Sequence, residues 1–218
     1  MDDATPAANP EASPKVAHPR AWVAAAASLS FALGLIQLGT DSYWVDDGFT
    51  LTHTNLGNAD FWRVIADHEM NAVLYSILMH GWVQVDQSET WIRLPSVLFA
   101  TAVVPVLYLL GRRLFDQRVA VTAAFLLAVN AFVVEYAHDA RTYAFTVATT
   151  SVLFLVRYLQ QPSRGRWWAW VVLTALLPHA HFFGLLLVGA QAAALLFRGA
   201  LPTPRRGLIG GFAVVGVA

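Results

Sequence analysis

The chain contains no cysteine and few charged residues, since only 13% of its 218 residues are Asp, Glu, Lys or Arg. The absence of cysteine excludes disulfides and thiolate metal sites. A soluble domain usually carries about twice this charged fraction. The basic residues form no stripe, so nucleic acid is not an expected partner. What is abundant is apolar: 57% of the residues are hydrophobic and the mean hydropathy is +0.52, which is typical of a polytopic membrane protein.

The N-terminal segment differs in composition from the rest of the chain. Residues 1–20 contain four prolines and mostly small or polar residues, which predicts a disordered cytoplasmic tail. Residues 21–38 form the first long apolar run. A cleaved signal peptide is the alternative, but the run is longer than an ordinary signal core and no A-x-A site follows it. We therefore predict a transmembrane domain over residues 21–218.

Later apolar runs and the arginines between them predict the topology. The runs cover residues 94–111, 119–134, 142–156, 167–177, 182–197 and 207–218. Eleven of the 14 basic residues lie before the first run or in alternate gaps, and only Arg63, Arg93 and Arg141 lie on the other side. Because basic residues mark the cytoplasmic face, the pattern predicts an all-α, polytopic transmembrane helical bundle of about seven spans with its N-terminus inside.

The apolar segment 71–85 is a test of this topology. Counting it as a span would turn the arginine-rich gaps outward, against the positive-inside rule. It has about fifteen residues, fewer than the roughly 20 that a spanning helix needs, and His80 and Gln84 interrupt it. We interpret it as an in-plane or re-entrant helix on the outer face, with a true span as the alternative.

The predicted first outer loop, residues 39–93, is rich in acids and tryptophans. It holds eight Asp or Glu residues, and its pattern predicts two short helices near 46–56 and 58–67, separated at Gly57. Its aromatic side chains suit the headgroup level of a membrane, and that belt is the simplest interpretation of most of its tryptophans.

Three polar clusters are predicted to meet at the outer surface. They are the pair Asp46-Asp47, the segment 135–143, and the His-x-His segment 178–181. Each has a purely structural alternative. An Asp before a short helix is often an N-cap, a charged link between spans is often solvated, and a histidine pair often forms hydrogen bonds instead of binding a metal.

These motifs carry a resemblance to a known family. The Trp44-Val45-Asp46-Asp47 segment is followed by an LYxxLxHxW-like stretch at 74–82, and then by Ile92-Arg93-Leu94-Pro95-Ser96. Their order and spacing resemble the family 39 membrane glycosyltransferases, which include protein O-mannosyltransferases and the lipid A aminoarabinose transferase and have the C-type glycosyltransferase fold. The resemblance covers residues 40–195. One departure is Glu69-Met70-Asn71-Ala72-Val73, where many members have His- or Asn-Pro-Pro.

The resemblance implies a reaction and a set of site residues. Such enzymes move a sugar from a polyprenyl-phosphate donor to an acceptor hydroxyl on a glycan, lipid or protein at the extracytoplasmic face, usually with inversion. Asp46 then corresponds to the base, and Asp47 stands where many members have Glu. The remaining candidate residues, for binding substrate, are His80, Arg93, Asp139, Arg141 and Tyr143. No cofactor is expected, and a divalent metal is left open.

Two other functions remain as alternatives. A transporter or flippase of lipid-linked sugars would place ionisable residues near the middle of its spans, whereas here they lie at the ends. A noncatalytic membrane scaffold is the other alternative. Because the chain ends inside an apolar run and family members continue through further spans, we expect this chain to be the N-terminal part of a longer plasma-membrane enzyme.

Overall fold

The computed structural model describes residues 16–36, 38, 45–67, 72–137 and 143–197, and their regular structure is entirely α-helical. This confirms the predicted all-α class. The helices are α1 (Pro19–Leu35), α2 (Val45–Thr54), α3 (Asn58–Asp67), α4 (Val73–Trp82), α5 (Glu89–Leu114), α6 (Gln117–Ala128), α7 (Ala131–Tyr136), α8 (Tyr143–Gln160), α9 (Arg164–Ala180) and α10 (Gly184–Phe197).

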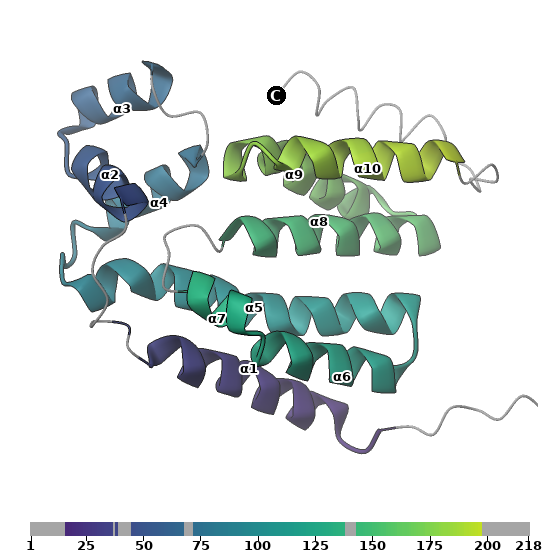
Figure 1. Ribbon diagram of the computed structural model, residues 1–218. Helices are drawn as coiled ribbons and strands as arrows, with labels where there is room; N and C mark the ends of the chain where they lie inside the picture. The colour runs from purple at the N-terminus through teal and green to yellow at the C-terminus, as the bar shows by residue number, and fades with distance from the viewer. Residues whose placement is uncertain (1–15, 37, 39–44, 68–71, 138–142, 198–218) are drawn as a thin grey trace, which may run out of the picture.

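Six of these helices lie side by side as a bundle (Figure 1). Helix α5 packs against α1, α6 and α8, while α9 packs against α8 and α10. Successive members of the bundle run in opposite directions. The six helices correspond to the first six apolar runs of the sequence. The last run, 207–218, lies outside the described residues.

Helix α5 is the one described helix that is long and apolar enough to cross a membrane, judged by length and composition. It has 26 residues, and an 18-residue window within it has a mean hydropathy of 2.0. At a rise of about 1.5 Å per residue its length is about 39 Å, more than the roughly 30 Å of a hydrocarbon core. Residues Gln117–Ala128 and Gly184–Leu195 form shorter apolar helices.

The apolar run 119–134 is not the single helix that the sequence predicts. Helix α6 ends at Ala128, and α7 begins at Ala131. The Asn130 side chain accepts a hydrogen bond from the backbone N–H of Val133 at 3.1 Å and so caps α7. An Asn carboxamide competes with the helical backbone in this way, which explains the break inside an otherwise apolar run.

The short helices of the predicted outer loop agree with the sequence pattern. Helices α2 and α3 match the expected helices near 46–56 and 58–67, and they are separated at residues 55–57. Within the ambiguous segment 71–85 the structure has helix α4, of ten residues. At about 15 Å it is too short to cross a hydrocarbon core, in agreement with the prediction that this segment is not an ordinary span.

Basic residues gather at one end of the bundle. This end carries the start of α1, the turn between α5 and α6, and the turn between α8 and α9 (Figure 1). The arginines placed there are Arg20, Arg112, Arg113, Arg118, Arg157, Arg164 and Arg166. Arg113 and Gln160 join the two turns, because the Arg113 guanidinium donates to Gln160 Oε1 at 3.2 Å and Gln160 Nε2 donates to the Arg113 carbonyl at 2.9 Å. The fold thus brings the arginines of alternate gaps to a common face.

Most of the predicted N-terminal tail, residues 1–15, lies outside the described residues. Helix α1 begins at Pro19, two residues before the predicted start of the first apolar run. Proline suits the first turn of a helix, because the backbone N–H that it lacks has no helical partner there.

Candidate active site

The short helices α2, α3 and α4 lie at the end of the bundle opposite the arginines of the turns (Figure 1). Helix α4 packs against both α2 and α9. Asp46 and Asp47 belong to the first turn of α2, which begins at Val45, so neither acid precedes the helix. The contacts of their side chains lie outside the described part of the chain. Carboxylates are favoured in a first helical turn by the positive end of the helix dipole.

The C-terminal half of α2 is fixed to α4 by a buried polar contact. The His53 Nε2 atom lies 3.0 Å from the Ser76 hydroxyl, and both side chains are buried. Separating the two helices here would leave buried polar atoms without this contact, which costs free energy. The helix that carries the two acids is therefore held at its far end by a specific contact.

His80, a predicted substrate-binding residue, connects three helices. Its Nδ1 donates to the Thr54 carbonyl at 2.8 Å, and its Nε2 lies 2.8 Å from the Asn58 carboxamide. The imidazole also stacks on the Phe61 ring with 3.9 Å between centroids. His80 therefore fixes the end of α2 and the start of α3 against α4, and any contact of His80 with substrate stays a prediction.

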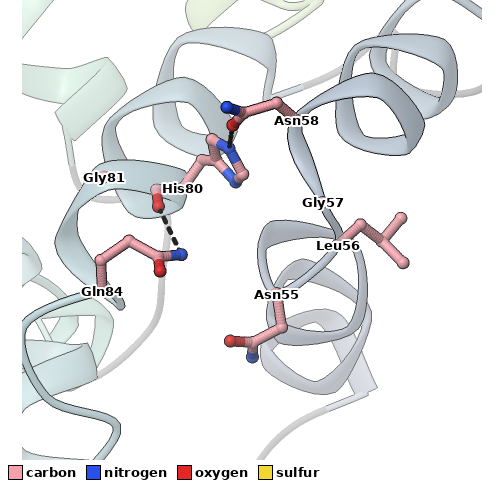
Figure 2. A pocket seen from close by; sticks show the side chains of 7 residues that line it. All are labelled: Asn55, Leu56, Gly57, Asn58, His80, Gly81 and Gln84. Atoms are coloured by element: carbon pink, nitrogen blue, oxygen red, sulfur yellow. Dashed lines mark hydrogen bonds between the residues drawn. The ribbon is translucent and has the colours of Figure 1, made fainter.

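An open pocket lies where these three helices meet (Figure 2). Its volume is about 550 Å³, and its lining residues are Asn55, Leu56, Gly57, Asn58, His80, Gly81 and Gln84. Three of the seven lining residues carry carboxamides, and no Asp, Glu, Lys or Arg lines the pocket. The sequence analysis missed this pocket, because its walls come from segments more than twenty residues apart.

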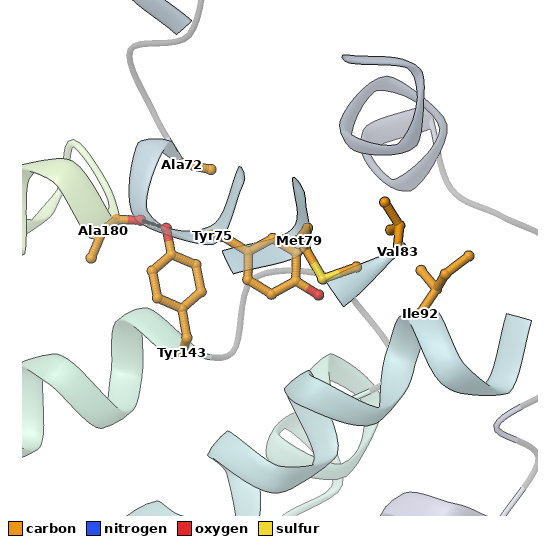
Figure 3. Packing of buried hydrophobic residues seen from close by; sticks show 7 residues of the cluster. All are labelled: Ala72, Tyr75, Met79, Val83, Ile92, Tyr143 and Ala180. Atoms are coloured by element: carbon orange, nitrogen blue, oxygen red, sulfur yellow. Dashed lines mark hydrogen bonds between the residues drawn. The ribbon is translucent and has the colours of Figure 1, made fainter. Parts of the chain in front are cut away.

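Tyr143 joins two of the three polar clusters that the sequence predicts to meet. Its hydroxyl, at the start of α8, donates to the Ala180 carbonyl in the last turn of α9 (Figure 3). Its ring stacks on Tyr75 of α4, with 5.2 Å between centroids. The Tyr75 hydroxyl in turn lies 3.3 Å from that of Ser96 on α5. Tyr143 is buried and anchors these helices. Its predicted contact with substrate stays a prediction.

Asp139 and Arg141 lie outside the described residues, so their predicted roles stay predictions. Glu135, in the same segment, belongs to α7 and is exposed. Tyr143, the last residue of the segment, begins α8 and donates to α9.

Arg93 is buried in the first turns of α5, with 3% of its side chain exposed. Its guanidinium donates to the Leu38 carbonyl at 3.0 Å and pairs with Glu89 at 3.1 Å. Through these contacts Arg93 fixes the segment after α1 to the start of α5. The predicted contact of Arg93 with a lipid phosphate stays a prediction.

The two histidines of the His-x-His segment lie at the end of α9. His179 lies in the last turn of the helix, and His181 is its C-cap residue. The His181 Nδ1 atom accepts from the Phe183 backbone N–H at 3.3 Å. Within the described ranges, no group of three or more His, Asp or Glu residues could hold a metal ion.

These observations define a class of protein: a helical bundle with one apolar helix long enough to span a membrane, an arginine-rich end, and an opposite end that carries three short helices. The sequence model of a family described as dolichyl-phosphate-mannose-protein mannosyltransferase matches residues 71–214, more than half of the chain. The chain belongs to this family. It is therefore a membrane glycosyltransferase of the mannosyltransferase type. No curated protein and no solved structure matches the chain.

Some of the candidate residues lie inside the range matched by the family and some lie outside it. It includes His80, Arg93, Asp139, Arg141 and Tyr143. Asp46 and Asp47 precede the matched range, so the assignment of the base rests on the local motif and on the place of α2 in the fold.

Proposed function

We propose that this glycosyltransferase takes its sugar from a polyprenyl-phosphate donor and transfers it to an acceptor hydroxyl at the extracytoplasmic face. The observation that carries the proposal is the family match, together with the position of α2 opposite the arginine-rich end. Basic residues favour the cytoplasmic side of a membrane, so this arrangement supports an extracytoplasmic location for Asp46 and Asp47.

The reaction is a single displacement at the anomeric carbon. The acceptor oxygen forms a bond to that carbon while the bond from the carbon to the phosphate oxygen breaks, and the polyprenyl phosphate leaves with the electron pair. Asp46 accepts the acceptor proton, and Asp47 orients the acceptor. A positioned base of this kind contributes about 10²–10⁴-fold to the rate. Since a phosphate is already a good leaving group, a strong general acid is not required.

The departing phosphate gains charge in the transition state, and cationic side chains stabilise it there. Arg141 is the principal candidate for this role. Arg93 is the second candidate, and it already donates to Leu38 and pairs with Glu89. A guanidinium suits a phosphate because it can donate two parallel hydrogen bonds.

The distribution of charge in the fold supports an enzyme over a transporter. Within the described bundle helices, the charged side chains lie in the first two turns or in the last turn. A transporter would use ionisable residues near the middle of its spans.

Transfer by the full-length protein in lipid nanodiscs tests the proposal. The protein is incubated with a panel of polyprenyl-phosphate sugars, or with the corresponding nucleotide sugars, and a panel of glycan, lipid and peptide acceptors. We expect glycosylated product and released polyprenyl phosphate with a lipid-linked donor only. Transfer from a nucleotide sugar, or no transfer from any lipid-linked sugar, would contradict the proposal.

A further inference from the structure

We propose that the pocket between α2, α3 and α4 is a subsite for an uncharged sugar residue of the acceptor. This proposal rests on the proposed glycosyl transfer and names part of its acceptor. The pocket is the one lined by Asn55, Asn58, His80 and Gln84, together with Leu56, Gly57 and Gly81 (Figure 2).

The hydrogen-bonding groups of the pocket match sugar hydroxyls. A hydroxyl both donates and accepts, and a carboxamide offers both kinds of group within one side chain. Asn58 uses one end of its carboxamide on His80 Nε2, and Gln84 uses its Nε2 to donate to the His80 carbonyl at 3.3 Å. The other end of each carboxamide has no hydrogen bond within the described residues. The Asn58 amide nitrogen and the Gln84 amide oxygen can therefore each pair with a hydroxyl.

The charge of the lining selects against ionic ligands. Apart from the imidazole of His80, every side chain that lines the pocket is uncharged at all ordinary pH values. A phosphate or a carboxylate would find no Lys or Arg among the lining residues to pair with. A neutral, hydroxyl-rich group loses less hydration and regains its hydrogen bonds from the carboxamides.

The polar groups of the pocket are held in place before any ligand arrives. Asn55 Nδ2 donates to the Leu51 carbonyl and Asn55 Oδ1 accepts from Gln87 Nε2, both at 3.0 Å. His80 is fixed by its two hydrogen bonds and by stacking on Phe61. Fixed groups reduce the conformational entropy that binding would otherwise cost.

The size and position of the pocket suit one part of a larger acceptor. Its volume of about 550 Å³ lies within the range of small-ligand sites. A Cβ atom added at Gly57 or Gly81 would meet nothing within 4 Å, so a ligand can approach the backbone there. Asn55 lies about 13 Å from Asp46 along the axis of α2, at a rise of about 1.5 Å per residue. The pocket is therefore too far from Asp46 to hold the reacting hydroxyl, but it can hold a neighbouring sugar of the same acceptor.

A peptide is the other acceptor that carboxamides could bind. An extended peptide is usually held by a row of main-chain donors and acceptors, such as an exposed strand edge. The described residues contain no strand, and the pocket offers side-chain amides from separate helices. The geometry therefore favours a saccharide.

Saccharide binding without any donor tests the subsite. The probes are methyl α-mannoside, mannobiose and cellobiose, titrated by saturation-transfer NMR onto the full-length protein in nanodiscs. Gln84→Leu removes one free amide end, and Gly81→Phe places a ring in open space. We expect at least one saccharide to bind, and each variant to weaken it by about tenfold or more. Gln161→Leu is the matched control, since Gln161 is exposed at the arginine-rich end. This variant should bind the saccharide as the parent protein does.

Three results would overturn the subsite: none of the saccharides binds, both pocket variants bind like the parent protein, or the variants weaken a Ser/Thr peptide and no saccharide. Circular dichroism of each variant checks that the helices are retained. The donor assay separates this proposal from the proposed function. If saccharide binding depends on Gln84 but no lipid-linked sugar is transferred, the result supports the subsite and contradicts the proposed polyprenyl-phosphate donor.

Discussion

Trp82 and Trp91 hold each other by two reciprocal hydrogen bonds. The Trp82 indole N–H donates to the Trp91 carbonyl at 2.9 Å, and the Trp91 indole N–H donates to the Trp82 carbonyl at 3.1 Å. The two rings are stacked, with 4.5 Å between centroids and 11° between planes. In the same turn the Ser88 hydroxyl and N–H donate to Asp86, which lowers the pKa of that carboxyl. This pairing joins α4 to α5.

Trp82→Phe should loosen the connection between α4 and α5. Phenylalanine keeps an aromatic ring for stacking but loses the indole donor, and one lost hydrogen bond costs about 1 kcal/mol. We expect a lower thermal unfolding temperature and faster limited proteolysis between residues 82 and 91. Trp62→Phe is the control, because Trp62 is 53% exposed, and it should change neither measurement. Equal effects of the two substitutions would remove any special role for the pair.

Gln191 joins three helices through a buried, uncharged network. Its Oε1 accepts from the Trp170 indole at 2.9 Å, and its Nε2 donates to the Ser151 hydroxyl at 3.0 Å. The Ser151 hydroxyl also lies 2.9 Å from that of Thr174. The network therefore connects α8, α9 and α10 inside the bundle.

Gln191→Leu keeps the apolar packing but removes the Oε1 atom that accepts from the buried Trp170 indole. A buried donor that loses its acceptor costs about 1–3 kcal/mol. We expect the unfolding temperature in detergent to fall, whereas Gln161→Leu at the exposed arginine-rich end should have no effect. A network without energetic value would give the same unfolding temperature for both variants.

Much of this fold could be predicted from the sequence, because hydrophobic runs and polar breaks are local signals. The first six of the seven predicted runs match the six bundle helices, and the loop pattern with its break at Gly57 predicted α2 and α3. The break at Asn130 was missed because a single polar residue in an apolar run is a weak signal. The partners of His53 and His80 could not be predicted, since they lie more than twenty residues away in sequence and meet only after packing.

The topology can be tested directly, because the chain has no cysteine of its own. Cysteine introduced by Ala59→Cys would lie on α3, and cysteine introduced by Gln161→Cys would lie in the turn between α8 and α9. Both positions are exposed. We expect an impermeant thiol reagent to label position 59 but not position 161 in intact cells, and to label both after lysis. The reverse pattern would place the arginine-rich end outside.

Arg141→Lys tests the role of the guanidinium in holding phosphate. Lysine keeps the positive charge but cannot donate two parallel hydrogen bonds from a planar group. We expect weaker donor binding and slower turnover, with normal insertion into the membrane. Arg63→Lys is a suitable control, because Arg63 is exposed and pairs with Asp60 within α3. Unchanged donor affinity and turnover in Arg141→Lys would leave Arg141 a topological or packing role only.

Asp46→Asn tests the assignment of the base most sharply. Asparagine keeps the size and hydrogen bonding of the side chain but cannot accept the acceptor proton at neutral pH. Turnover of the full-length enzyme should fall by at least about 10²-fold, the lower end of what a general base contributes. Insertion should be normal, because an acid in the first turn of a short helix adds little to the packing of the bundle.

The matched control is Asp47→Asn, which changes the neighbouring residue of the same helical turn. Both substitutions remove one negative charge from the start of α2, so both lose the same favourable interaction with the helix dipole, worth about 0.3–1 kcal/mol. A difference between them in turnover therefore reports proton transfer and not helix stability. We expect Asp47→Asn to cost less. If Asp46→Asn retains near-normal turnover, Asp46 serves only the helix, and Asp47 and then Asp139 become the residues to test as the base.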